Sequence, residues 1–487
     1  MNNTKGRIIF RADGNSQMGL GHIVRCGALS ESIGNEFERI LYTCCNLPAV
    51  LTEANKNFTA INLLSEETDL SAEAKKITSE IRVSDIVVLD GYHFREEYQE
   101  ILRSTGASIV CIDDIHEYFF NADVIINSAG GITPMDYNAL PGTLFYFGPQ
   151  YSLLRKPFLK EAGKGKLREK NRKIFICLGG ADPENRTLEV VKFIASLKKF
   201  EELRIVTGGG YQFADELNQY LKGNGLKASV GTSLNAEAMA SEMLSCSYAV
   251  CSPSTVCFEY MTIGGIVYLE QIATNQDDMI RFLTREGFAF QLKDAEKENE
   301  IAEQKSLEKQ AAVFDGKASD RLKKIVEQIF LSQQFVVRKV LAGDMMLCYE
   351  WINEPAVREQ SYNNNAIPLS DHEKWFASKL EDPNSYYYIL ELDAKPMAQI
   401  RFQVSGNEAV LGYLVDKNYR NVGLGTTILS KGITAFTDDY KKVISITGFV
   451  KEANIASQKS FEKLKFKKEA AKEYAASYKY IMQYDGH

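Results

Sequence analysis

Short apolar, β-branched runs alternate with amphipathic helical segments over the first part of the chain. The runs predicted as buried strands are residues 7–13, 39–44, 85–90, 108–113 and 123–127. Between them, residues 22–33 and 72–83 carry apolar residues at helical spacing. This alternation predicts right-handed βαβ units and a doubly wound parallel sheet.

The same pattern returns after a charged, glycine-containing stretch at 159–173, which lacks an apolar stripe and is predicted to link two domains. Four further strands are predicted at residues 173–180, 203–210, 248–254 and 266–271. Two successive Rossmann-like halves predict a ligand cleft between them, at the carboxyl ends of the strands.

The pattern changes after a polar, Lys/Glu-rich region at 292–334, because the strands predicted beyond it look antiparallel: residues 386–392, 398–404 and 409–415. The predicted fold class is therefore α/β, with two Rossmann-like domains followed by a C-terminal α+β domain. We place the domains at residues 1–160, 170–330 and 335–487. A length of 487 residues agrees with three domains.

Composition narrows the classes of function. Lys+Arg 57 against Asp+Glu 64 gives a net charge of −7, which argues against a general nucleic-acid or anionic-membrane surface. Any anionic ligand must then be held by a local site such as a helix N-terminus. No apolar run approaches the roughly 18 residues of a membrane span. The five histidines form no i, i+4 pair and no Cys/His cluster, so no metal site is expected.

Cysteine usage and the N-terminal residues bear on the compartment. The nine cysteines are an odd number and contain no CxxC pair, which favours reduced thiols in a cytoplasmic protein. The first residues enter a strand-like run without the apolar core of a signal peptide.

A glycine loop, RADGNSQMGLGHIVRC at 11–26, follows the first predicted strand and opens the first helix. Gly19 and Gly21 allow a tight turn that exposes N–H groups at the helix N-terminus. Val24 takes the third glycine position of the dinucleotide fingerprint, so the loop is not that motif. His22 falls at the helix start, where the positive helix end favours the neutral imidazole of a general base. A structural histidine capping a core helix is the alternative.

A polar loop, GGADPENRT at 179–187, follows the first strand of the second half. Asp182 is expected to cap a helix whose first position is Pro183. Its backbone could cradle a phosphate or contact a base; an ordinary strand-to-helix turn is the alternative.

A third loop, CSPSTVCFEYMTIGG at 251–265, puts Ser254 and Thr255 at a helix start and Glu259 one turn later. Hydroxyl and free N–H groups suit a diphosphate, and the carboxylate suits ribose hydroxyls. A capped surface helix with a solvated glutamate is the alternative. The polar residues TNQ at 274–276 follow the next strand on the same sheet edge.

These loops resemble those of the UDP-sugar hydrolases of pseudaminic acid biosynthesis, two-domain proteins of GT-B fold. The motifs that carry the resemblance, over about residues 5–300, are the loop at 11–26, LDGYHF (89–94), IDD (112–114), GPQYSLLRKPF (148–158), GGADPENRT (179–187), CSPSTVCFEY (251–260) and TNQ (274–276). The resemblance implies removal of UDP from UDP-2,4-diacetamido-2,4,6-trideoxy-β-L-altropyranose by water attack at the anomeric carbon. We infer an inverting displacement that needs no metal.

The resemblance also implies roles for single residues. His22 would be the base that activates water, and Asn185 and Glu259 would contact uridine and ribose. The expected neighbours of the diphosphate or the sugar are Gly21, Ser254, Thr255, Asn275 and Gln276. Asp13 could orient His22 or bind sugar, with a structural role as the alternative.

A second candidate site lies in residues 409–429, which read as a strand, a loop and a helix. Arg420, Gly423 and Gly425 form an RxxGxG loop whose backbone N–H groups could surround a pyrophosphate, and Thr426 enters the helix. A simple glycine-containing turn is the alternative. With the strand, helix and strand predicted at 448–450, 454–466 and 478–484, this region resembles the GNAT acyl-CoA N-acyltransferases over about residues 335–487.

The second resemblance implies acetyl-CoA as co-substrate, with its pyrophosphate on the RxxGxG loop and its pantetheine alongside the strand at 412–415. The residues implied in acetyl-CoA binding are Leu414, Val415, Arg420, Val422, Gly423, Leu424, Gly425, Thr426 and Asn454. Many members carry a tyrosine that protonates the departing thiolate, but here Phe461 takes that position. Tyr474, Tyr478 or water are the candidates for this role, and Tyr478 is the residue we select.

Together the two resemblances imply a bifunctional enzyme with small-molecule partners. The C-terminal domain would N-acetylate UDP-4-amino-4,6-dideoxy-N-acetyl-β-L-altrosamine, and the N-terminal pair would then hydrolyse the product to UDP and free sugar. A GT-B glycosyltransferase, fused to an acyltransferase or to a non-catalytic CoA-binding module, is the alternative. The release of UDP with water alone distinguishes them.

Overall fold

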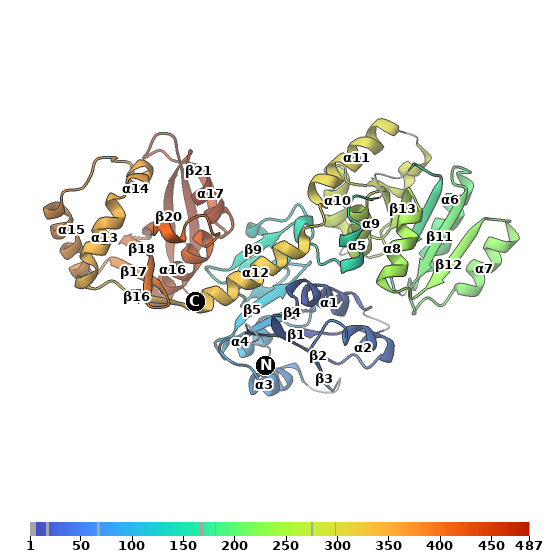
Figure 1. Cartoon of the computed structure of the whole chain (residues 1–487), viewed down its shortest axis with the longest axis horizontal. Coiled ribbons are helices and arrows are strands. Elements are labelled where there is room, and N and C mark those ends of the chain that lie inside the picture. The colour runs from blue at the N-terminus through green and yellow to red at the C-terminus, as the bar shows by residue number, and fades with distance from the viewer. Residues whose placement is uncertain are drawn as a thin grey trace. The chain divides into compact units, whose positions relative to one another are not determined.

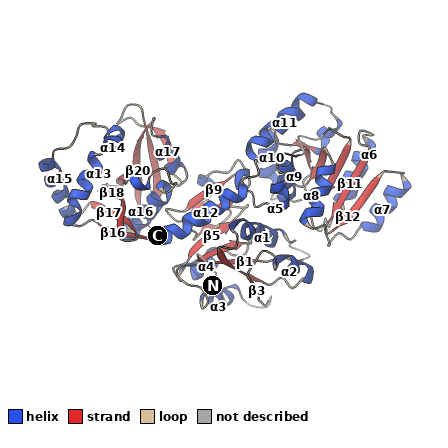
Figure 2. Cartoon of the chain, viewed as in Figure 1, coloured by secondary structure: helices blue, strands red, loops and turns tan. Residues whose placement is uncertain are grey.

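A computed structural model describes residues 6–15, 19–65, 69–164, 169–180, 182–273, 276–297 and 299–486 of the chain. It contains two Rossmann-like parallel sheets followed by a mixed sheet (Figures 1 and 2), which confirms the predicted fold class. The chain divides into two compact units. The first comprises Met1–Tyr118, Ile126–Thr133 and Tyr146–Val326, and the second comprises Phe119–Ile125, Pro134–Phe145 and Glu327–His487.

The first sheet has seven strands. In sheet order they are β3 (Ala60–Leu63), β2 (Phe37–Thr43), β1 (Gly6–Ala12), β4 (Ile86–Asp90), β5 (Ser108–Ile112), β7 (Val124–Asn127) and β9 (Leu144–Phe147). Its helices are α1 (Gly21–Ile33), α2 (Pro48–Ala54), α3 (Leu70–Thr78) and α4 (Glu96–Arg103). The helix predicted at 72–83 thus ends at Thr78. β1 pairs in parallel with β2 on one side and β4 on the other, so the strand order reverses at β1 and a crevice is expected at its carboxyl end.

The second sheet is parallel throughout its six strands. In sheet order they are β12 (Ala228–Thr232), β11 (Glu202–Thr207), β10 (Lys173–Cys177), β13 (Tyr248–Cys251), β14 (Ile266–Leu269) and β15 (Phe290–Gln291). Alternate residues of β10 enter two separate cores, with Ile174 and Ile176 in one and Phe175 and Cys177 in the other. Both faces of the sheet are therefore covered, as expected for a parallel sheet.

The helices of this second part are α5 (Lys156–Lys160), α6 (Arg186–Ser196), α7 (Ala214–Gly223), α8 (Ala236–Ser245), α9 (Thr255–Ile263), α10 (Asp277–Arg285), α11 (Glu300–Val313) and α12 (Ala318–Gln333). One helix start differs from the prediction, because α6 begins at Arg186 and not at Pro183. The Asp182 carboxylate still caps it, accepting from the backbone N–H groups of Arg186 at 2.8 Å and Thr187 at 2.7 Å. Asp182 does so from the loop before the helix.

The third sheet is mixed. In sheet order its strands are β16 (Phe335–Lys339), β17 (Ser385–Leu392), β18 (Lys395–Ser405), β19 (Glu408–Val415), β20 (Ile444–Lys451), β22 (Ser477–Tyr484) and β21 (Lys467–Ala470). Its helices are α13 (Met345–Asn353), α14 (Pro355–Gln360), α15 (Leu369–Glu381), α16 (Gly425–Tyr440) and α17 (Ile455–Glu462). The pairs β17–β18 and β18–β19 are antiparallel, as predicted. The pair β16–β17 is also antiparallel, whereas β19 and β20 are parallel.

The parallel pairing of β19 with β20 covers only half of β19. It runs from Glu408 opposite Ser445 to Leu411 opposite Gly448 and then stops, while the pairing of β19 with β18 continues to Val415. Within the part of the chain that the structure describes, β19 has no ladder partner on its β20 side from Gly412 onward. The two strands thus separate in the middle of the sheet and leave an open strand edge at 412–415.

The second unit also includes two segments from the first half of the chain. Within them β6 (Phe119–Phe120) and β8 (Asn138–Ala139) form a short parallel pair. The Ser430 hydroxyl on α16 donates to the Gly142 carbonyl oxygen at 2.5 Å. No local sequence pattern indicates this contact, because 288 residues separate its partners.

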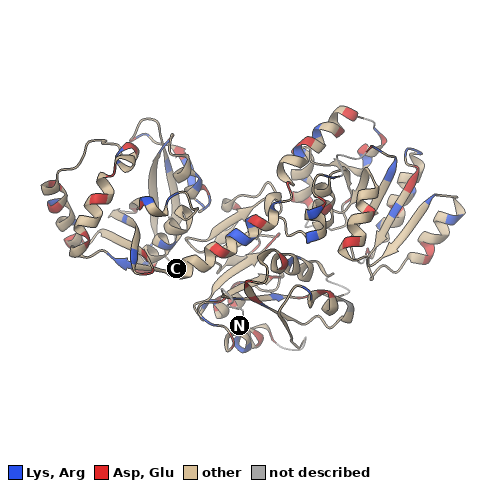
Figure 3. Cartoon of the chain, in the orientation of Figure 1, with Lys and Arg blue, Asp and Glu red and all other residues tan. Residues whose placement is uncertain are grey.

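Charged residues of both signs are interspersed on the helices (Figure 3). Over the described residues, no helix is long and apolar enough to cross a bilayer. All nine cysteines lie within the described residues, and none of them forms a disulfide.

Candidate active sites

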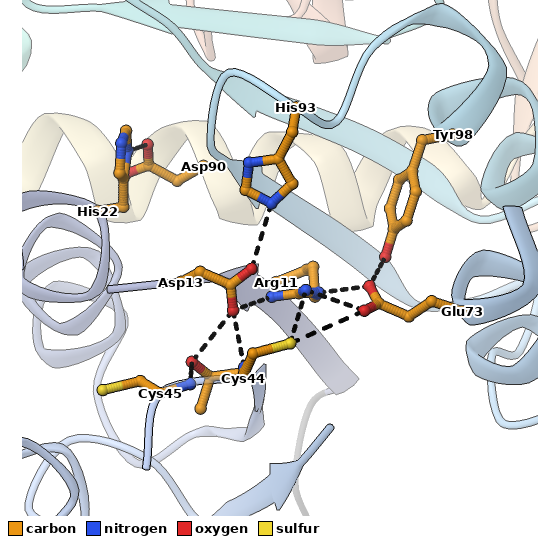
Figure 4. Close-up of polar contacts among 10 residues, drawn as sticks. Arg11, Asp13, His22, Cys44, Cys45, Glu73, Asp90, His93 and Tyr98 are labelled. Carbon is orange, nitrogen blue, oxygen red and sulfur yellow. Dashed lines mark hydrogen bonds and ion pairs between the residues drawn. The ribbon is translucent and has the colours of Figure 1, made fainter. Parts of the chain in front are cut away.

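The first candidate site lies where β1 and β4 end. Ala12 and Asp90 are directly paired at the carboxyl ends of these strands, and α1 begins at Gly21 with His22 as its second residue. His22 Nδ1 lies 2.7 Å from Oδ1 of Asp90, and both side chains are buried (Figure 4). The helix start predicted from the glycine loop therefore brings His22 onto a carboxylate at the switch point of the sheet.

Two groups contact Nδ1 of His22 and favour different tautomers. The Asp90 carboxylate, 2.7 Å away, can only accept a hydrogen bond, whereas Nη2 of Arg25, 3.0 Å away, can only donate one. The shorter contact favours the proton on Nδ1. Nε2 then carries a lone pair, and it has no hydrogen-bond partner among the described residues. A histidine held in this way can take a proton from a water molecule at Nε2.

Arg25, one turn along α1, neutralises the carboxylate behind His22. Its guanidinium donates to both oxygens of Asp90, at 2.6 and 3.0 Å, and to Asp114 at 2.9 Å. Burial raises the pKa of Asp114, but the charge and hydrogen bond of Arg25 outweigh it and lower that pKa below its usual value. The Tyr92 ring packs edge-on against the His22 ring, with 5.0 Å between centroids. His22 is thus fixed on two sides.

Asp13 makes different contacts from those considered in the sequence. Arg11 donates to it at 2.5 Å, the backbone N–H of Cys44 donates at 2.7 Å, and His93 Nε2 lies 3.2 Å from its second oxygen (Figure 4). Burial raises the pKa of Asp13, but the hydrogen bonds from His93 and Arg11 outweigh it and hold the pKa well below its usual value. The residue that orients His22 is Asp90, and Asp13 forms a second carboxylate–imidazole pair at the end of the neighbouring strand.

Arg11, which donates to Asp13, also forms a buried ion pair with Glu73. Arg11 is 1% exposed and donates to both oxygens of Glu73, at 2.7 and 3.1 Å, while the Tyr98 hydroxyl donates to Glu73 at 2.8 Å. The Arg11 guanidinium also lies over the Phe94 ring, 4.7 Å from its centroid. This arrangement holds the Asp13 carboxylate in one position.

The expected diphosphate neighbours of the second half lie at strand ends and helix starts. Ser254 precedes α9 and bonds Ser252 through its hydroxyl at 3.0 Å, and Thr255 is the first residue of that helix. The Gln276 side chain accepts from the backbone N–H groups of Ile272 at 2.9 Å and of Ala273 at 3.3 Å, which closes the loop before α10. Asn275 lies outside the described residues.

The two residues expected to contact uridine and ribose already have protein partners. Asn185 precedes α6 in a left-handed conformation, accepts from the Tyr211 hydroxyl at 2.6 Å and donates to Glu216 at 3.0 Å. Glu259 is 1% exposed and is held by Arg155 through two hydrogen bonds, at 2.8 and 2.9 Å. Arg155 precedes α5, which packs on α8 and α9, so this ion pair joins the start of α5 to α9.

The second candidate site is a pocket of about 1030 Å³ in the C-terminal domain. One wall is the open edge of β19 together with the loop at 419–426, and another is α17 with the end of β20. A Cβ added at Gly412 would meet nothing within 4 Å, so this glycine leaves open space beside the strand. The pocket therefore opens directly onto the strand edge.

The pocket brings together eight of the nine residues expected to bind acetyl-CoA. They are Leu414, Val415, Arg420, Gly423, Leu424, Gly425, Thr426 and Asn454. Val422 is not among the lining residues and is 53% exposed. α16 begins at Gly425 and has no acidic residue in its first turn, so its N-terminal N–H groups suit a pyrophosphate.

Arg420 forms hydrogen bonds with other residues of the C-terminal domain. It donates to both oxygens of Glu354, at 2.8 and 2.7 Å, and to the Val415 carbonyl oxygen at 2.7 Å. These three bonds fix the loop between β19 and α16, where Asn421 and Gly423 both have positive φ. In this structure, the arginine of the RxxGxG motif therefore shapes the loop.

Phe461 and Tyr478 differ in their relation to the pocket. Phe461 lines the pocket but is 2% exposed and packs against Tyr480 and Phe466. Tyr478 is not among the lining residues, and the Lys468 ammonium lies over its ring, 4.0 Å from the centroid. Tyr413 on β19 does line the pocket, and its hydroxyl lies 3.1 Å from the Ser457 hydroxyl on α17.

Sequence reasoning did not single out several residues that surround these sites. Asp90, Tyr92 and Asp114 lie in the motifs LDGYHF and IDD, whose position at strand ends was the available signal. Tyr413 had no such signal, because its role depends on where β19 and β20 separate. The described residues contain no group of three His, Cys, Asp or Glu side chains that could hold a metal ion.

Comparison with known proteins gives the class of the C-terminal domain first. Residues 334–467 match the family model "Acetyltransferase (GNAT) domain", and the C-terminal domain is a GNAT acetyltransferase domain. The structure of AAC(6')-Ib with ribostamycin and coenzyme A is 18% identical and covers 31% of this chain and 93% of its own, with a TM-score of 0.28.

The rest of the chain has distant relatives. The UDP-2,4-diacetamido-2,4,6-trideoxy-beta-L-altropyranose hydrolase of Campylobacter jejuni is 22% identical over 300 residues, which is 59% of this chain and 99% of that protein. An uncharacterized protein of Methanocaldococcus jannaschii is 23% identical over 397 residues, which is 77% of this chain and 78% of that protein. The N-terminal region is thus distantly similar to a UDP-sugar hydrolase.

Proposed function

We propose that the chain is a bifunctional nucleotide-sugar enzyme of pseudaminic acid biosynthesis. Its C-terminal domain acetylates the 4-amino group of UDP-4-amino-4,6-dideoxy-N-acetyl-β-L-altrosamine with acetyl-CoA. Its N-terminal domains then hydrolyse UDP-2,4-diacetamido-2,4,6-trideoxy-β-L-altropyranose. The observation that carries the hydrolase assignment is the His22–Asp90 pair, 2.7 Å apart at the switch point of the first sheet. The similarity to the Campylobacter jejuni hydrolase supports the choice of substrate.

In the proposed hydrolysis, His22 takes a proton from water at Nε2 while the water oxygen bonds to the anomeric carbon. The bond from that carbon to the diphosphate oxygen breaks, and UDP leaves with the electron pair. Asp90 stabilises the imidazolium that forms, because its carboxylate already accepts from Nδ1. In this proposal, the backbone N–H groups at the start of α9, where Ser254 and Thr255 lie, stabilise the leaving diphosphate.

The C-terminal pocket fits acetyl-CoA. The open edge at 412–415 offers main-chain groups to an extended pantetheine, in the manner of an added strand, and the α16 N-terminus offers N–H groups to a pyrophosphate. Acetyl-CoA supplies an acetyl group activated as a thioester. His372 lines this pocket and is 3% exposed, and its Nε2 has no hydrogen-bond partner within the described part of the chain. Burial lowers its pKa, so this nitrogen can take the proton that the attacking amine gives up.

Tyr413 is the residue we propose as the acid that protonates the departing thiolate. Burial raises the pKa of its hydroxyl, so it holds a proton at neutral pH. We expect Tyr413→Phe to lower kcat of acetyl transfer by about 10²- to 10⁴-fold with little change in KM for acetyl-CoA. Steady-state thiol release measures this. The matched control is Tyr478→Phe, and a loss of kcat in that variant with none in Tyr413→Phe would reverse the assignment.

The function as a whole is tested by mass spectrometry of the UDP-linked amino sugar incubated with the protein. With acetyl-CoA present, we expect one acetyl group to be gained and UDP and free diacetamido sugar to follow. No acceptor other than water is added. If UDP appears only after a sugar acceptor is supplied, the N-terminal domains are a glycosyltransferase and the proposal is wrong.

A further inference from the structure

The pocket of the C-terminal domain has a third wall, which acetyl-CoA binding does not explain. It is formed by α14, α15, β17 and β18, on the side of β19 away from β20. The side chains that line this wall include Arg358, Trp375, Tyr387, Gln399 and Arg401. An acetyl acceptor is expected here, because the strand edge and the pyrophosphate loop face the other part of the pocket.

Arg401 is a partly buried cation of this wall that is not held by a carboxylate. Among the described residues it makes no hydrogen bond and no ion pair, and its guanidinium lies 4.8 Å from the centroid of the Trp375 ring. Arg338 and Arg420 of the same domain are each held by carboxylates through paired hydrogen bonds. Burial without a carboxylate nearby lowers the pKa of Arg401. The guanidinium thus has donors to offer and a charge that is not neutralised.

Arg401 lies beside the part of the pocket where acetyl transfer is proposed. It pairs across β18 and β19 with Gly412, so the two residues share one face of the sheet at the point where β19 leaves β20. Gly412 has no side chain to occupy that face. Trp375, from α15, is 36% exposed and holds the guanidinium on the acceptor side by cation–π contact.

The excess of positive charge in the pocket lining favours some classes of acetyl acceptor over others. Six Lys or Arg side chains line it, namely Arg358, Arg401, Arg420, Lys451, Lys459 and Lys463, against one carboxylate, Asp371. Arg420 is neutralised by Glu354, and Lys459 and Lys463 belong to α17 and its C-cap, on the acetyl-CoA side. A polycationic acceptor would be repelled by this lining, whereas an acceptor that carries phosphate would be attracted.

We propose that Arg401, held on Trp375, binds a phosphate of the nucleotide-linked amino sugar that was proposed above as the acetyl acceptor. This proposal rests on the acetyltransferase activity proposed above. Guanidinium donors form paired hydrogen bonds with phosphate oxygens, and the exposed Trp375 ring offers a surface for the nucleoside or the sugar. Arg401 is a specificity residue, which recognises the acceptor away from the amine that reacts.

The kinetic test compares two acceptors, the UDP-linked amino sugar and the same amino sugar without its nucleotide. We expect Arg401→Gln to raise KM for the UDP-linked acceptor by about 10- to 100-fold, with kcat and KM for acetyl-CoA nearly unchanged. kcat/KM for the free amino sugar should not change, and Arg401→Lys should recover part of the loss because it keeps the charge. An equal rise in KM for both acceptors, or a rise in KM for acetyl-CoA, overturns the proposal.

A binding test separates this proposal from the proposed function. Both tryptophans of the chain, Trp351 and Trp375, lie in the C-terminal domain, so UDP added to the full chain with coenzyme A should change their fluorescence. We expect saturable quenching that Arg401→Gln abolishes and Arg401→Lys retains at weaker affinity. If this holds but no acetyl transfer occurs, the acceptor subsite stands and the acetyltransferase assignment fails. If acetyl transfer occurs and neither KM nor quenching depends on Arg401, the subsite is wrong and the activity stands.

Discussion

Replacing His22 with glutamine should lower the rate of UDP release by about 10²- to 10⁴-fold, the range that a general base contributes. Glutamine keeps a polar side chain at the second position of α1 but has no lone pair basic enough to take a proton from water. UDP binding should stay within a few-fold, because His22 is not among the groups proposed to hold the diphosphate. Quenched-flow measurement of UDP release and calorimetry with UDP check the two expectations. Acetyl transfer by the same sample should be unchanged, which reports that the protein is folded.

The structure offers a matched control for this variant. His93 is also held by a carboxylate, Asp13, at the end of the strand next to β4, but its ring is more exposed, at 29%. His93→Gln should keep most of the UDP release, whereas Asp90→Asn should lose part of it, because a neutral amide cannot stabilise an imidazolium as a carboxylate does. Loss of turnover in His93→Gln with turnover retained in His22→Gln would move the base to the second pair.

The second large effect is expected for stability. Arg155→Met leaves the Glu259 carboxylate, 1% exposed, without the two hydrogen bonds that neutralise it. We expect this to lower the free energy of unfolding of the first unit by about 3 kcal/mol, the lower end for a broken buried pair, since Arg155 keeps 27% of its side chain exposed. Urea denaturation followed by circular dichroism measures this loss of stability. The first unit should unfold at a lower urea concentration, and the transition of the second unit should not change.

Two further variants show whether the uncompensated charge is the cause. Adding Glu259→Gln to Arg155→Met removes the buried charge and should recover much of the lost stability. Arg281→Met removes an exposed ion pair with Asp278 on α10 and should cost less than about 1 kcal/mol. Equal losses for Arg155→Met and Arg281→Met would mean that burial of Glu259 does not matter.

The elements that the sequence predicted best are those whose apolar pattern is local. The strands at β1, β4, β5, β10 and β13 are short, β-branched and buried on both faces, so each can be recognised alone. β3 is half exposed, and β15 and β21 are short; these were missed because their pairing depends on neighbours that are distant in the sequence. No local pattern in the sequence indicates that residues 134–145 belong with the C-terminal domain.

The residues of the candidate sites could likewise be predicted only where they depend on local features of the chain. Gly19 and His22 could be placed from spacing, because a loop and a helix start are local features. Asp90 could not be assigned to His22, since the contact joins the ends of two strands 68 residues apart. Arg401 was not recognised because an arginine in an alternating strand reads as a solvated residue. Its lack of a partner becomes visible only when β17, β18 and α15 are assembled.

The open edge of β19 has a consequence for how the protein should be handled. A strand with unpaired main-chain groups is a template for any extended chain, including a strand of another molecule. Acetyl-CoA that pairs with residues 412–415 would cover this template, so by mass action the bound form gains stability of about 2.7 kcal/mol at a hundredfold excess over Kd. We therefore expect the purified protein to aggregate more readily when its cofactor is removed, and coenzyme A to serve as its protective additive during storage.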